Sequence, residues 1–168
     1  MLRPAVPPEL DPASLGDHLD RLYRAAWALC GSREDAEDLV QETYARVLAR
    51  PRDVAAAGEP LPYLLAVLRN TFISSLRRRE RRPRTAPIED AEDRMAAPAS
   101  ASPAAAVAAR EVFAAIAALP DDQRMVVAAV DVAGLSYAEA AESLEVPVGP
   151  VMSRLYRGRT RVAQAVGE

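Results

Sequence analysis

The chain has 168 residues, half of them hydrophobic by type, and this length can bury a core without help from metals or disulfides. Its net charge of −3 argues against a general nucleic-acid coat, and the single cysteine, Cys30, cannot form an internal disulfide. No apolar stretch approaches the roughly 20 residues that cross a bilayer, and residues 1–11 lack the apolar region of a signal peptide. We therefore expect a soluble, cytoplasmic protein without membrane insertion.

The composition favours helices. Aromatic residues make up only 5% of the chain and alanines are abundant, which predicts an all-α fold of closely packed helices. The charges are unevenly placed, because arginines crowd residues 77–84 and 154–161 while acidic residues collect at 34–42 and 89–93. Separate basic and acidic stretches are typical of a protein that contacts DNA through a local surface but does not bind DNA tightly by itself.

The first part of the chain predicts three helices after a tail over residues 1–14. Apolar residues recur at helical spacing from Leu15 to Cys30, and Gly31 is placed to end that helix in the left-handed conformation. Ser32, with Asp35 three residues later, predicts the capped start of a second helix that ends before Pro51. A loop over 51–62 precedes a third helix, which runs out into the arginines.

Residues 83–105 lose helical periodicity and are rich in Pro, Ala and Ser, so they predict a flexible linker. The linker divides the chain into two small helical domains, residues 15–82 and 106–168. The second domain is expected to hold helices over 106–119, 121–132, 136–144 and 149–166.

Capping residues support these boundaries. Asp121 is the expected N-cap of its helix, and Ser136 with Glu139 predicts a capping box. Pro150 is tolerated in the first turn of the last helix.

The last two helices have the layout of a helix-turn-helix, whose second helix enters the major groove of DNA. Val151, Leu155 and Val162 are expected to face the core. The outward residues are then the candidates for DNA contact, the alternative being a solvated basic helix end that the helix dipole favours. These candidates are Met152, Ser153, Arg154, Tyr156 and Arg157.

The acidic helix could by itself be an ordinary polar surface with acids near a helix N-terminus. However, its segment Asp35-Ala-Glu-Asp-Leu-Val-Gln-Glu-Thr resembles the core-polymerase-binding segment of the extracytoplasmic-function (ECF) sigma factors of bacteria. Pro62-Tyr-Leu-Leu-Ala-Val-Leu-Arg-Asn is similar to that family's promoter-melting helix. Leu119-Pro-Asp-Asp-Gln-Arg and Val146-Pro-Val-Gly-Pro-Val-Met-Ser-Arg-Leu-Tyr-Arg resemble its minus-thirty-five domain.

The resemblance covers about residues 15–166 and implies a role for each block. It implies three partners: core RNA polymerase, promoter DNA and an anti-sigma factor. The polymerase would be bound through its flap and through the clamp helices of its largest subunit. The implied polymerase-binding residues are Asp35, Asp38, Leu39, Gln41 and Glu42. Those for the minus-ten element, held as a separated strand, are Tyr63, Arg69, Asn70, Arg77 and Arg78. Those for the minus-thirty-five element, read as duplex, are Ser136, Pro150, Met152, Ser153, Arg154, Tyr156 and Arg157.

Three positions depart from the family pattern. Tyr63 stands where tryptophan is usual, Ser75 replaces a common aspartate, and Pro150 replaces the usual threonine. Pro150 lacks both the hydroxyl and the backbone N–H that could contact a phosphate, so an atypical promoter preference is expected.

No catalytic or metal-binding set emerges from the sequence. His18 is the only histidine and no glycine-rich phosphate loop is present, so we expect no enzyme activity, no cofactor, no metal and no small-molecule substrate. Two other classes stay open: a helix-turn-helix regulator that binds its operator alone, and a polymerase-binding decoy that has lost promoter function.

Overall fold

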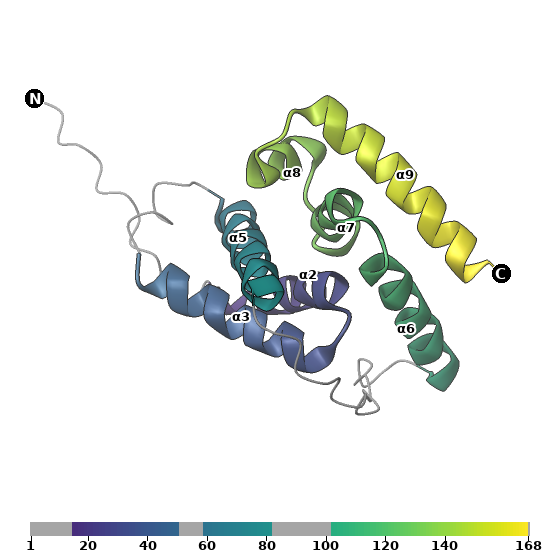
Figure 1. Ribbon diagram of the computed structural model, residues 1–168, viewed down its shortest axis with the longest axis horizontal. Coiled ribbons are helices and arrows are strands. Elements are labelled where there is room, and N and C mark those ends of the chain that lie inside the picture. The colour runs from purple at the N-terminus through teal and green to yellow at the C-terminus, as the bar shows by residue number, and fades with distance from the viewer. Residues whose placement is uncertain (1–14, 51–58, 82–101, 168) are drawn as a thin grey trace, which may run out of the picture.

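A computed structural model describes residues 15–50, 59–81 and 102–167, and every regular element in those ranges is a helix (Figure 1). The predicted all-α fold is confirmed. The expected tail over 1–14, most of the loop over 51–62 and residues 83–101 of the expected linker lie outside the described residues.

The N-terminal domain contains three long helices: α2 (Leu19–Cys30), α3 (Arg33–Leu48) and α5 (Pro60–Arg81). Gly31 has a φ of 75° and its N–H donates to the Trp27 carbonyl, so the predicted left-handed end of α2 is confirmed. The Ser32 side chain accepts from the Asp35 N–H at 3.2 Å, which confirms the predicted cap of α3. However, α2 begins four residues after Leu15, and α5 begins at Pro60 rather than Pro62.

The C-terminal domain contains α6 (Pro103–Ala117), α7 (Asp121–Val127), η1 (Ala128–Val132), α8 (Tyr137–Leu144) and α9 (Val148–Val166). The expectation that Asp121 caps α7 is wrong, because Pro120 holds the cap position and Asp121 is already helical. The last turn of the expected helix over 121–132 is a π-helix, η1, which the sequence did not reveal. The helix over 103–117 begins inside the expected linker, where Ser102 caps it.

The start and end of α8 are fixed by local hydrogen bonds and backbone conformation. The Ser136 hydroxyl accepts from the Glu139 N–H at 3.2 Å, and the Glu139 carboxylate accepts from the Ser136 N–H at 2.7 Å. The predicted capping box is therefore confirmed. At the other end, Glu145 is left-handed with a φ of 55°, the one non-glycine residue with positive φ in the described ranges.

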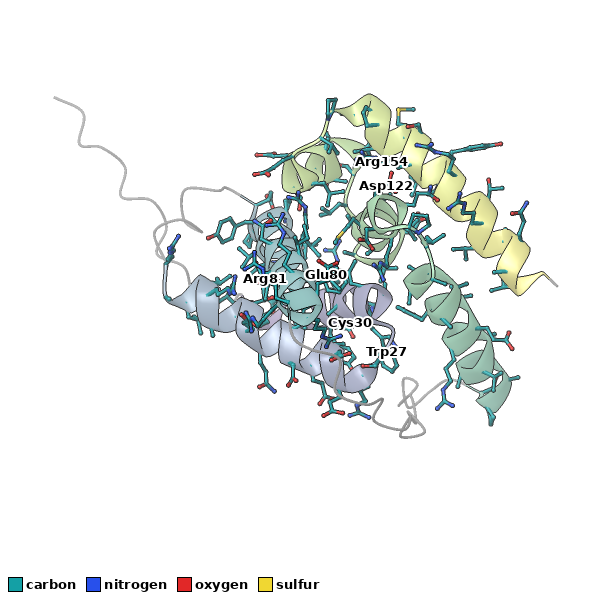
Figure 2. The ribbon with its side chains drawn as sticks, viewed as in Figure 1. Trp27, Cys30, Glu80, Arg81, Asp122 and Arg154 are labelled. Carbon is teal, nitrogen blue, oxygen red and sulfur yellow. The ribbon has the colours of Figure 1, made fainter. Side chains whose placement is uncertain are left out.

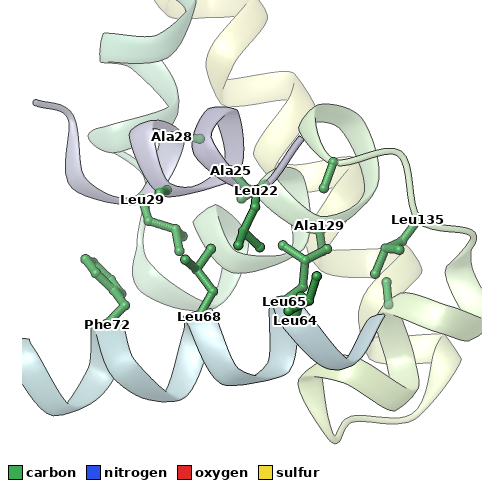
Figure 3. Close-up of a cluster of buried hydrophobic side chains, with 14 of the residues drawn as sticks. Leu22, Ala25, Ala28, Leu29, Leu64, Leu65, Leu68, Phe72, Ala129 and Leu135 are labelled. Atoms are coloured by element: carbon green, nitrogen blue, oxygen red, sulfur yellow. The ribbon is translucent and has the colours of Figure 1, made fainter. Parts of the chain in front are cut away.

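The two domains share a single hydrophobic core. Leu22 of α2 and Leu64 of α5 are fully buried, and they lie in the same cluster as Ala129 of η1 and Leu135 (Figure 3). Helices α2 and α5 supply most of the N-terminal side of this cluster, and they lie against the C-terminal helices in the overall view (Figure 1). The N-terminal and C-terminal helices therefore pack directly on one another.

Candidate functional site

The acidic side of α3 borders a cavity of about 380 Å³. Asp38 is exposed and Glu42 is half-buried, while Leu39 is 5% exposed and belongs to the core. Arg124 of α7 reaches the same cavity from the C-terminal domain. Four of the five expected polymerase-binding residues are thus brought together at one edge: Asp35, Asp38, Leu39 and Glu42.

Arginines at the end of α5 face the acidic side of α3. The Arg79 guanidinium lies 2.5 Å from the Asp35 carboxylate, and Arg78 lies 3.9 Å from Glu42, which also accepts from Arg46 at 2.6 Å. These pairs are largely exposed and each contributes at most about 1 kcal/mol. The expected polymerase and minus-ten surfaces therefore meet along this line of ion pairs.

Gln41 lies apart from the other four. It borders a separate apolar hollow on the outer side of α2 and α3, together with Leu19, Tyr23 and Val40. Leu19 is 48% exposed, so this hollow offers apolar surface beside the acidic one. The sequence singled out the acids but missed this apolar contribution, because Leu19 falls in the apolar repeat from Leu15 to Cys30 and its exposure is visible only in the structure.

Two of the expected minus-ten residues meet in a hollow between α3 and α5. Tyr63 and Asn70 line it from α5, Arg46 lines it from α3 and Arg50 from just beyond the end of α3, around a volume of about 450 Å³. The two arginines were not among the sequence candidates, since nothing in the helical pattern of α3 separates them from a solvated helix end. An aromatic ring beside guanidinium groups is a chemistry suited to an unstacked base and its phosphate.

Arg69 points away from that hollow. Its Nη1 lies 3.5 Å from Glu145 at the end of α8, and 3.4 Å from the Asn70 side chain. Arg77 is exposed on the last turns of α5. The structure therefore brings Tyr63 and Asn70 together, and leaves Arg69 beside the C-terminal domain.

Helices α8 and α9 form the predicted helix-turn-helix. Val151 and Leu155 are 0% and 2% exposed and Val162 is partly buried, so the predicted inward face of α9 is confirmed. On the opposite face, Tyr156 is 74% and Met152 52% exposed. Other candidates that lie exposed with them are Pro150, Ser153 and Arg157, whereas Ser136 is exposed at the start of α8.

Arg154 departs from this face. Its Nε lies 3.3 Å from the Asp122 carboxylate of α7, and its side chain is 30% exposed (Figure 2). It lines a groove of about 340 Å³ between α5 and the C-terminal helices, together with Arg69 and Met125. Arg154 is thus held on a different side of α9 from Tyr156.

The sequence missed two contacts that fix α9 in place. Gly158 lies so close to α7 that a Cβ atom there would stand 2.7 Å from Val127 Cγ2. Arg159 donates to the Asp131 carboxylate of η1 at 3.0 and 2.6 Å, and this pairing raises the pKa of the guanidinium.

The thiol of Cys30 lies at the edge of the cavity beside α3, half-buried. Burial first, and the charge of Asp35 second, raise its pKa to about 12. Among the described residues, no cluster of three or more His, Cys, Asp or Glu side chains has a metal-binding arrangement. None of the described helices combines the length and apolar character that crossing a membrane requires.

Comparisons with known proteins give the class of protein. A model of sigma-70 region 2 matches residues 15–82, and a model of sigma-70 region 4 matches residues 109–162. The fold and these two matches define a sigma factor of the sigma-70 type, and the chain carries regions 2 and 4. The chain belongs to the ECF family of RNA polymerase sigma factors.

Two relatives carry that assignment. The chain is 37% identical over 149 residues to the ECF RNA polymerase sigma factor SigE of Mycolicibacterium smegmatis, over 86% of this chain and 57% of that protein. It is 37% identical over 141 residues to EcfG of Rhodopseudomonas palustris, over 82% of this chain and 75% of that protein. The chain therefore spans less than two thirds of the length of SigE.

Two solved structures share the fold. One is the sigma factor RpoE in complex with the anti-sigma factor NepR from Bartonella quintana, with a TM-score of 0.72 and 24% identity, covering 92% of this chain and 95% of that chain. The other is CnrH in complex with the cytosolic domain of CnrY, with a TM-score of 0.66 and 20% identity over 92% of this chain and 86% of that chain.

Proposed function

We propose that this chain binds core RNA polymerase and directs it to promoters, reading the minus-thirty-five element as duplex and the minus-ten element as a separated strand. The observation that carries the proposal most directly is the face of α9 on which Met152, Ser153, Tyr156 and Arg157 all lie in solvent while Val151 and Leu155 are buried. A recognition helix needs this division, because its inner face must anchor it while its outer face meets base edges and phosphates.

The proposed polymerase surface is the acidic side of α3. Asp38 and Gln41 are exposed one helical turn apart, and Leu39 lies buried between them, so the backbone that carries the two polar side chains is fixed by the core. A partner with basic groups would gain charge-assisted hydrogen bonds there. We assign this surface to the clamp helices of the largest polymerase subunit, and the C-terminal domain to the flap.

The proposed minus-ten surface is the hollow formed by Tyr63, Asn70, Arg46 and Arg50. A base stacked on the Tyr63 ring would contribute about 1–3 kcal/mol, and the two arginines would neutralise the adjacent backbone. Arg77 and Arg78 extend the basic surface along the exposed end of α5.

An anti-sigma factor is the proposed regulatory partner. Of the two solved structures that share this fold, that of RpoE contains the anti-sigma factor NepR, and that of CnrH contains the cytosolic domain of CnrY.

Core binding tests the proposal directly. The dissociation constant for purified core polymerase is measured for the labelled unmodified chain and for two double variants. The first double variant carries Asp38→Arg and Gln41→Ala. The second is the matched control, which carries Glu111→Arg and Gln164→Ala at exposed positions of α6 and α9. We expect at least a tenfold weaker constant for the first double variant and no change for the control. Absence of core binding by the unmodified chain, or equal binding by both variants, would overturn the assignment.

A further inference from the structure

A hollow between the start of α5 and one face of α8 is lined by carboxylates. Its volume is about 340 Å³, within the range of about 300–1,000 Å³ that is usual for small-molecule sites. Three acidic residues line it, Glu59 directly before α5 and Glu139 and Glu142 on α8, and none of the described arginines does. Because α8 packs on α5, residues far apart in the sequence bring their negative charges to one place.

Two of these carboxylates have no positive partner. Glu59 and Glu142 are exposed, and within residues 15–50, 59–81 and 102–167 neither forms an ion pair or a side-chain hydrogen bond. Asp35 on α3, in contrast, pairs with Arg79. Like charges that share one hollow repel one another, so a cation bound there would relieve this repulsion.

The carboxylate of Glu139 is fixed by the capping box. Its Oε2 accepts from the Ser136 N–H at 2.7 Å, which leaves Oε1 available to a ligand. Hydrogen bonding by Ser136, through its side chain first, lowers the pKa of this carboxyl, so the carboxyl is charged at neutral pH. Glu142 stands three residues further along, on the same side of α8. The two helix positions therefore add two negative charges to the same wall.

A buried hydroxyl in this wall lacks a hydrogen bond. Ser143 is 3% exposed and lines the hollow, and its Oγ has no partner among the described residues. A buried polar group without a partner destabilises the fold, and a donor bound in the hollow would satisfy it. This orphaned hydroxyl distinguishes the hollow from an ordinary solvated acidic surface.

The chemistry of the walls fits an alkylammonium ligand. An ammonium group carries three donors and no acceptor, which matches carboxylates and a hydroxyl oxygen. Pro62, Tyr63 and Ala66 of α5 line the rest of the hollow and offer apolar and aromatic surface to the methylene groups and the charge of such a ligand. The described acidic residues do not stand in a metal-binding arrangement, so an organic cation fits better than a metal ion.

We propose that this hollow binds a linear polyamine, whose ammonium groups pair with the three carboxylates while the Ser143 hydroxyl accepts from one of them. Two or more ammonium groups on one methylene chain match carboxylates that come from two separate elements. Tyr63 lines both this hollow and the proposed minus-ten hollow, but the polyamine site rests on no step of promoter recognition.

Binding of spermidine to the full chain is measured by isothermal titration calorimetry. One double variant carries Glu59→Gln and Glu142→Gln, which removes two charges from the hollow at exposed positions and leaves the capping box intact. The matched control carries Glu34→Gln and Glu111→Gln, at exposed positions of α3 and α6 outside the hollow. Thermal midpoints show that both double variants fold.

We expect one spermidine per chain, with a dissociation constant at least about tenfold weaker in the first double variant and unchanged in the control. No binding by the unmodified chain, or the same loss in both double variants, would overturn the site, since the latter means that spermidine follows the net charge alone. The proposed sigma function is judged separately by core binding.

Ser143→Ala separates a ligand contact from a structural role. Removal of an orphaned hydroxyl should leave the thermal midpoint of the free chain unchanged or higher, yet weaken spermidine binding about threefold or more. Unchanged spermidine binding in this variant would overturn the assignment of Ser143 to the site.

Two further titrations test the class of ligand. Butylamine, which carries a single ammonium group, should bind at least about tenfold more weakly than spermidine. Mg²⁺ should displace spermidine no more than Na⁺ does at equal ionic strength. Equal affinity for butylamine would overturn the polyamine assignment, and stronger displacement by Mg²⁺ would show a metal site instead.

Discussion

Arg159 of α9 donates two hydrogen bonds to the Asp131 carboxylate of η1, from Nε at 3.0 Å and from Nη2 at 2.6 Å. Asp131 lies in the π-helical turn, so the widened turn carries the acid that holds α9 in place. An arginine from the basic stretch over residues 154–161 is therefore engaged within the domain.

Arg159→Ala is expected to lower the thermal midpoint by roughly 1–3 °C, because a partly exposed bidentate pair contributes up to about 1 kcal/mol. Arg161→Ala, an exposed arginine on the same helix, is the control and should leave the midpoint unchanged. Thermal unfolding followed by circular dichroism measures both. Equal losses in the two variants would contradict a specific role for the pair.

Gly158→Ala is expected to destabilise the chain. A better helix former alone would add up to about 1 kcal/mol of stability, but the new Cβ would stand 2.7 Å from Val127 Cγ2, on a stiff, β-branched side chain that is 3% exposed. Overpacking of this kind typically costs about 1–3 kcal/mol, so the clash outweighs the propensity gain.

Gly149→Ala on the same helix is the matched control, because nothing lies within 4 Å of its added Cβ. Chemical denaturation should show a loss of stability for Gly158→Ala and none for Gly149→Ala. If Gly158→Ala is as stable as the unmodified chain, the close packing of α9 on α7 is wrong.

Glu139→Gln tests the capping box through pH. Hydrogen bonding by Ser136, from its side chain first and its backbone second, lowers the pKa of the Glu139 carboxyl below its usual 4.5. A lowered folded-state pKa means that the charged form stabilises the fold above pH 4.5, and that this contribution is lost as pH falls through the folded-state pKa. We expect Glu139→Gln to unfold about 1–2 °C below the unmodified chain at pH 7, and this difference to shrink as pH falls below 4.5. A difference in unfolding temperature that stays constant as pH falls below 4.5 would contradict this.

Cys30 is expected to be unreactive in the folded chain. With a pKa of about 12, only about 1 in 10,000 of the thiols is ionised at pH 8, and the thiolate is the reacting form. The rate of modification by a disulfide reagent at pH 8 should rise about 100-fold or more when urea unfolds the chain. Similar rates in the folded and unfolded chain would show that burial does not protect this thiol.

The helices and caps could be predicted because they depend on local features. Gly31, Ser32 and the Ser136–Glu139 box act within one turn of chain, and the apolar stripe of α9 has the helical period. The π-helix could not be predicted, since widening that turn depends on how α7 and η1 pack and not on a residue pattern.

The candidate site residues also fall into two groups, those whose placement follows from local sequence and those whose placement depends on tertiary packing. Outward positions on α9 follow from periodicity, but Arg154 turns toward Asp122 of α7, a partner 32 positions away whose location only the tertiary fold determines. Arg46 and Arg50 join Tyr63 for the same reason, because α3 and α5 meet side by side. The direct packing of one domain on the other includes hydrogen bonds from Arg21 and Arg124 to carbonyls of the opposite domain, which no local pattern reveals.

Promoter-specific transcription is the central claim, and it is tested by in vitro transcription from a genomic promoter pool with purified core polymerase. The unmodified chain should produce specific start sites that share two upstream motifs, and Asp38→Arg, Gln41→Ala should abolish them while Glu111→Arg, Gln164→Ala preserves them. Core binding by the chain without any specific start site would contradict the account and would favour a polymerase-binding decoy.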